Sequence, residues 1–146
     1  MRSWAAAAFL VALSGVLPVR AESVALARTL DVAEQAWNRA SPKSYEFMFR
    51  PVAILSFVGC AGKNLHVRVI DGIAKVPVTC RSEMIHYSTI PQLFKYIRDA
   101  IASHPDRIDV AFDPALGYPT SFFIDPKLNM HDDEFQFTIS HFRAIQ

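Results

Sequence analysis

Four carboxylates fall within ten residues near the end of the chain, at Asp125, Asp132, Asp133 and Glu134. Several carboxylate oxygens close together are the donors that calcium prefers, so the cluster could hold this ion or support a metal-dependent enzyme. Its spacing is not that of an EF-hand loop. Aspartates also open and close turns by accepting hydrogen bonds from nearby backbone amides, and Asp125 precedes a proline. We therefore favour turn formation and keep the metal- or calcium-binding enzyme as the alternative.

Other catalytic patterns are missing from the sequence. His131 stands beside the acidic cluster and His141 follows it, but the five histidines are scattered and none has the H-E-x-x-H or H-x-x-E-H spacing of a metal site. The chain contains no G-x-S-x-G motif and no glycine-rich phosphate loop. The sequence therefore predicts a domain without a catalytic function or a cofactor.

The first 21 residues are typical of a secretory signal peptide, with Arg2 ahead of an apolar stretch over residues 4–17. This stretch is too short to span a bilayer, and small residues at Val19 and Ala21 indicate cleavage after Ala21. The alternative is a short buried helix. No later segment is long and apolar enough to be a transmembrane helix. We expect a periplasmic or secreted protein.

Cleavage leaves residues 22–146, which is the length of one domain. Loss of Arg2 and Arg20 leaves 13 Lys and Arg against 14 Asp and Glu, a net charge of −1. This balance argues against a protein that binds nucleic acid or a membrane surface through its charge. In an oxidising compartment the two cysteines, Cys60 and Cys80, predict one disulfide, worth about 3 kcal/mol for a loop of this length.

Two segments have apolar residues at steps of three and four, which predicts helices over residues 23–40 and 89–104. Trp37 lies on the first apolar stripe and is interpreted as a core anchor. Thr89 is the expected N-cap of the second helix, and Pro91 suits its first turn.

Strand patterns fill the remaining chain. Asp71-Gly72 predicts a two-residue hairpin between residues 65–70 and 73–79, with Val69 opposite Ala74, Val67 opposite Val76 and Leu65 opposite Val78. A second hairpin joins residues 107–113 to 120–125, with Phe112 opposite Thr120, Val110 opposite Phe122 and Ile108 opposite Ile124. Residues 44–50 form a strand that Pro51 is expected to interrupt, and residues 135–140 form another.

The order of elements is therefore α-β-β-β-α-β-β-β. It predicts an α+β domain with an antiparallel sheet of about five to six strands and two helices packed on one face. The other face would carry polar residues, and we interpret it as a surface for a protein or small ligand of the envelope. Its expected members are Glu46, Arg50, His66, Arg68, Lys75, Asp109 and Gln136.

Two further features are candidate contacts. Tyr118, between Gly117 and Pro119, either packs on the sheet to stiffen its turn or contacts a ligand or partner together with Arg68 and His66. The apolar run of residues 52–58 either forms a buried strand or is covered by a partner in a larger assembly.

Several of these motifs occur together in a known family. The chain resembles the secreted bacterial proteins of the domain of unknown function 6174 over residues 37–140. The resemblance brings no known activity, substrate or cofactor. The matching positions are Trp37, Ser44, Tyr45, Val67, Val69, Asp71, Gly72, Thr89, Ile90, Leu93, Phe94, Asp113, Gly117, Tyr118, Pro119, Asp125, Asp132, Asp133 and Glu134.

Overall fold

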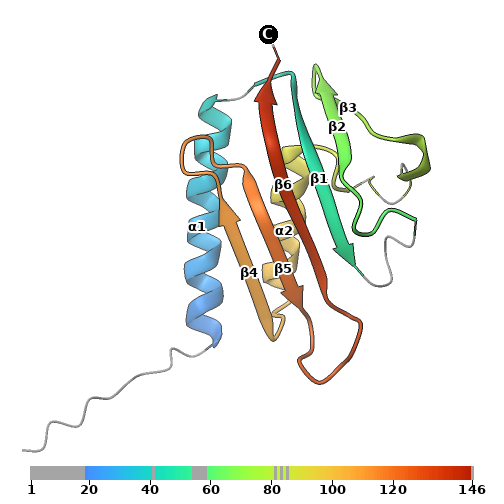
Figure 1. Cartoon of the computed structure of the whole chain (residues 1–146). Helices are drawn as coiled ribbons and strands as arrows, with labels where there is room; N and C mark the ends of the chain where they lie inside the picture. The colour runs from blue at the N-terminus through green and yellow to red at the C-terminus, as the bar shows by residue number, and fades with distance from the viewer. Residues whose placement is uncertain are drawn as a thin grey trace, which may run out of the picture.

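The computed structural model describes residues 19–40, 42–53, 59–80, 82, 84 and 86–145. A six-stranded antiparallel sheet in the order β3-β2-β1-β6-β5-β4 carries two helices on one face (Figure 1). The predicted α+β class and element order are confirmed. The elements are α1 (Val19–Ala40), β1 (Tyr45–Ala53), β2 (Leu65–Ile70), β3 (Ile73–Lys75), the 3-10 turn η1 (Val78–Cys80), α2 (Ile90–Ala102), β4 (Arg107–Phe112), β5 (Pro119–Asp125) and β6 (Phe135–Ala144).

The core lies between the helices and the sheet, because alternate strand residues point to that side. Trp37 of α1 is 4% exposed and packs edge-to-face on Tyr45, with ring centroids 5.2 Å apart. Its predicted role as a core anchor is confirmed. The Tyr45 hydroxyl accepts a hydrogen bond from the backbone N–H of Ile90 at 3.0 Å, which ties the start of α2 to β1.

The start of α2 has the predicted cap. The Thr89 side chain accepts from the backbone N–H of Gln92 at 3.3 Å, and the Gln92 side chain accepts from that of Thr89 at 3.1 Å. This reciprocal pair satisfies two amides that have no partner within the helix. The start of α1 precedes the predicted Ser23. Most of the predicted signal peptide lies outside the described residues, so its cleavage stays a prediction.

The hairpin around Asp71 and Gly72 has the predicted register only near its turn. Both turn residues have positive φ, and the pair of Val69 with Ala74 is as expected. The prediction that Val67 and Leu65 pair with residues 76 and 78 is wrong, because β3 ends at Lys75 and Val78 is 77% exposed. Pro77 has no N–H to continue the ladder, and the chain then turns into η1.

The prediction that Pro51 interrupts its strand is also wrong, since β1 continues to Ala53. Pairing with β2 stops at Phe49, while pairing with β6 continues past Pro51. The Pro51 carbonyl accepts a hydrogen bond from Gly62 on the β2 side. Its nitrogen faces the same side, beyond the last rung of β2, so no ladder bond is lost. Val52 is 44% exposed, and residues 54–58 of the apolar run lie outside the described part of the chain.

The β4–β5 hairpin has the predicted pairs of Ile108 with Ile124 and Val110 with Phe122. The third predicted pair is wrong, because Phe112 faces Pro119 in place of Thr120 across an irregularity in the ladder. The connecting loop also packs closely on α1. A Cβ atom added to Gly117, whose φ is +80°, would lie 2.1 Å from the Ala33 carbonyl oxygen.

Candidate functional site

The second face of the sheet is left uncovered by the two helices (Figure 1). The strand register places the side chains of this face in rows across the strands. Residues directly opposite each other in the ladder share a face, so the register assigns the members of each row. The structure places the seven predicted polar residues on this face. Additional members are Met48, Val52, Ile70, Ile73, Arg107, Ala111, Ser121, Phe123, Asp125, Thr138, Ser140 and Arg143.

Glu46 is the centre of the most highly charged row. Arg68 of β2 lies opposite it on one side and Arg143 of β6 on the other, and Lys75 follows Arg68 on β3. Arg143 donates a hydrogen bond to the Glu46 carboxylate, and His66 Nε2 lies 3.4 Å from the second oxygen. The Arg143 hydrogen bond lowers the pKa of Glu46, although burial opposes this. Arg143 and His66 therefore contact the Glu46 carboxylate, and Arg68 stands opposite Glu46 in the ladder without an ion pair to a described residue.

Arg143 was not predicted, because a bulge in β6 places it there. Glu46 pairs with Arg143 but Met48 pairs with Ser140, so β6 has one residue too many for simple alternation. His141 takes up the extra residue with φ +53°. Beyond it, Phe142 turns into the core and Arg143 turns to the uncovered face. In the sequence, the only sign of the bulge is the step of three residues between the core residues Ile139 and Phe142. A regular strand places successive core residues two apart.

The other half of the face carries a second ion pair. Arg107 Nε donates to Asp109 Oδ2 at 2.8 Å, and its guanidinium lies 4.9 Å from the centre of the Phe123 ring. Arg50 Nε donates to the Gly62 carbonyl at 3.3 Å. Among the described residues, the cations of the face outnumber its carboxylates, which are the exposed Asp109, the largely covered Glu46 and the buried Asp125 opposite Arg107. The cations are Arg50, Arg68, Lys75, Arg107 and Arg143, with His66 beside them.

Tyr118 lies apart from this face. Its ring stacks on Phe142 with centroids 4.4 Å apart, on the side of the sheet that the helices cover. Burial raises the pKa of the Tyr118 phenol, and the charge and hydrogen bond of Asp113 raise it further. The structure therefore brings His66 and Arg68 together around Glu46 but places Tyr118 elsewhere. Of the two alternatives for Tyr118, packing on the sheet is the one that its position matches.

The acidic cluster does not converge. Among the described residues, no group of three or more His, Cys, Asp or Glu side chains could hold a metal ion. Asp125 is 7% exposed at the end of β5, and Asp132 has φ +73°, as a turn residue does. Asp133 and Glu134 are half-buried residues that lead into β6, and Asp133 Oδ1, like Asp125 Oδ1, is buried without a hydrogen-bond partner among the described residues. The described residues therefore do not assemble the metal or calcium site that the alternative function requires.

Cys60 and Cys80 lie at disulfide distance, with Sγ atoms 1.91 Å and Cα atoms 6.0 Å apart. Both residues are buried, and the bridge joins the loop after β1 to η1. This pairing fits a periplasmic or extracellular protein.

The sequence profile of the family of unknown function DUF6174 matches residues 29–144. The chain belongs to this family. The match includes the whole sheet, α2 and the part of α1 that carries Trp37, so the uncovered face is built within the DUF6174 domain. No curated protein and no solved structure matches the chain. Within the described residues, neither helix has the length and apolar character needed to cross a membrane.

Proposed function

We propose that this DUF6174 protein is a non-catalytic binding module of the bacterial envelope. Its uncovered sheet face binds an acidic protein partner through the row of Lys75, Arg68 and Arg143. The excess of exposed cations on this face, in a chain of nearly balanced charge, carries the proposal.

The arrangement around Glu46 supports an acidic partner. Arg143 and His66 already contact the carboxylate, whereas Arg68 and Lys75 form no ion pair with any described residue. These two cations are exposed and stand opposite each other on the outer strands β2 and β3. A partner carboxylate can therefore meet them without breaking a contact within the domain.

A broad face of alternating charged and polar residues suits a protein surface. Met48 and Phe123 provide apolar and aromatic contact area among the charges, as in the mixed composition of non-obligate interfaces. Such a complex depends on charge for its association rate, so its affinity falls as salt is added.

The test compares two double charge reversals. Arg68→Glu with Lys75→Glu changes the uncovered face, and Arg28→Glu with Arg39→Glu changes exposed positions on α1 by the same total charge. Each protein is immobilised after its fold has been checked by circular dichroism. Envelope extract is then passed over it, and bound proteins are measured by quantitative mass spectrometry.

We expect an acidic protein that the wild type and the α1 variant retain and that the sheet-face variant loses by about ten-fold or more. This is the effect of turning two weak attractions into repulsions. Purified partner should then bind less tightly as the salt concentration rises. Equal retention by both variants would show that the uncovered face is not the binding surface.

A further inference from the structure

The outer edge of β4 has backbone groups that no described strand uses. Among the described strands, β4 is the last of the sheet and pairs only with β5. The backbone N–H of Asp106 donates to the Pro126 carbonyl at 3.3 Å, across the ladder toward β5. Because backbone groups alternate in direction along a strand, those of Arg107 and Asp109 point away from β5. The edge therefore presents donors and acceptors that another strand can pair with.

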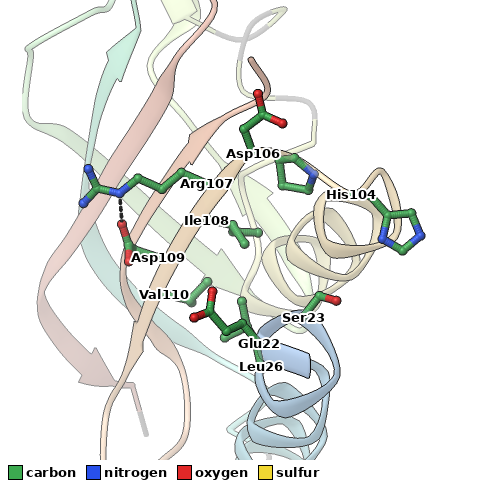
Figure 2. Close-up of a pocket in the computed structure, with 10 residues that line it drawn as sticks. Glu22, Ser23, Leu26, His104, Asp106, Arg107, Ile108, Asp109 and Val110 are labelled. Atoms are coloured by element: carbon green, nitrogen blue, oxygen red, sulfur yellow. Dashed lines mark hydrogen bonds and ion pairs between the residues drawn. The ribbon is translucent and has the colours of Figure 1, made fainter. Parts of the chain in front are cut away.

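A groove of about 930 Å³ lies along this edge, between β4 and the beginning of α1 (Figure 2). Leu26 of α1 and Ile108 and Val110 of β4 line it with apolar side chains. Glu22 of α1 also lines the groove, on the wall opposite β4 (Figure 2). Glu22 forms no ion pair with any described residue, whereas Arg107 and Asp109 on the opposite side are paired with each other. The groove thus combines an apolar floor with the Glu22 carboxylate on the α1 wall.

We propose that the β4 edge and this groove bind an extended segment of a partner protein, which adds a strand beside β4. Backbone groups of the segment pair with Arg107 and Asp109. Alternate side chains of the segment enter the groove, where apolar residues meet Leu26, Ile108 and Val110 and a lysine or arginine meets Glu22. This is the strand-addition mode of peptide recognition, in which backbone pairing supplies affinity and pockets for alternate residues supply specificity.

A single segment fits this edge better than a second copy of the chain. α1 runs along the outer side of β4 (Figure 1). Residues of both elements line the groove. Pairing β4 with its copy by two-fold symmetry brings two α1 helices to the same side of the junction. A single added strand needs only the distance that separates neighbouring strands of a sheet. The proposal is independent of the uncovered face, because its contacts come from α1, the backbone of β4, and the Ile108 and Val110 side chains on the side of the sheet that the helices cover.

The first test blocks the backbone. Asp109→Pro removes an outward N–H that β5 does not use, so the fold is retained, and Asp109→Ala is the matched control that also loses the Arg107 ion pair. A displayed library of random eight-residue peptides is selected on the wild type and measured on both variants. We expect enriched peptides with apolar residues at alternate positions and one Lys or Arg, retained by Asp109→Ala and reduced at least ten-fold on Asp109→Pro. A library without such peptides, or peptides that bind Asp109→Pro equally well, would overturn the proposal.

The second test examines the charge and the place of binding. Glu22→Lys should weaken the best peptide by about two- to five-fold and favour a version of it that has glutamate in place of the basic residue. Hydrogen exchange measured by NMR should slow at the amides of Arg107 and Asp109 when the peptide is added. If these amides are already protected at high protein concentration and the protein sediments as a dimer, a second copy occupies the edge and the proposal is wrong.

Discussion

Replacing Gly117 by alanine adds one methyl group at the contact between α1 and the β4–β5 loop, and so tests this contact. Gly117 follows β4 in the loop to β5 and approaches the Ala33 carbonyl of α1. Gly72, in the β2–β3 turn, has the same φ of +80° but nothing within 4 Å of an added Cβ atom. Alanine at either glycine therefore causes the same kind of backbone strain, and only alanine at 117 adds a collision.

The two effects can be separated in magnitude. A non-glycine residue in the left-handed region costs about 1–2 kcal/mol, and the reduced freedom of the unfolded chain offsets about 0.4–1 kcal/mol of this. Gly72→Ala should therefore destabilise the protein by about 1 kcal/mol. In Gly117→Ala the new Cβ would lie 2.1 Å from the Ala33 oxygen and 3.0 Å from the Ala36 Cβ, so α1 or the loop must move. Overpacking of this kind costs a further 1–3 kcal/mol.

Thermal unfolding by circular dichroism measures the difference. For a domain of this size, about 1 kcal/mol corresponds to roughly 4 °C in Tm. We expect a fall of about 4 °C for Gly72→Ala and of 8 °C or more for Gly117→Ala. Equal falls for the two variants would refute the close contact between the loop and α1. Since α1 forms one wall of the β4 groove, Gly117→Ala should also weaken any peptide that binds there.

Three further outcomes are expected. Replacing Cys60 and Cys80 together by alanine should lower the unfolding free energy by about 3 kcal/mol in urea, and an unchanged midpoint would contradict a structural disulfide. Tyr45→Phe leaves the buried N–H of Ile90 without its acceptor and should cost about 1–3 kcal/mol; a loss near zero would mean that another group replaces the hydroxyl. Burial raises the pKa of all four tyrosines above 10.0, so the unfolded chain loses phenolic protons first and stability falls as the pH rises past 10. Ultraviolet absorbance should then show ionisation together with unfolding, and tyrosines that titrate near pH 10.0 in the folded protein would contradict this. The four are Tyr45, Tyr87, Tyr96 and Tyr118.

Part of the candidate site could be predicted from local pattern. Alternation in β1 and β2 places Glu46, His66 and Arg68 on one face, and the Asp71-Gly72 turn fixes the partner of Arg68 as Lys75. Arg143 could not be found this way. Its position depends on a bulge, beyond which Phe142 packs on Trp37 and Tyr118 from distant parts of the chain. The strand order also lies beyond local pattern, since β1 pairs with β6 from the far end of the chain.

The sequence by itself determined the α+β class, both helices, the two hairpins and the choice of Cys60 and Cys80 as partners. Each of these follows from residues close in the chain or from the compartment. Tertiary structure alone decided that β1 passes through Pro51, that Arg143 joins Glu46, and that α1 forms a groove with the edge of β4. These features depend on which backbone groups and side chains meet across the sheet, and such meetings are set by the packing of distant segments.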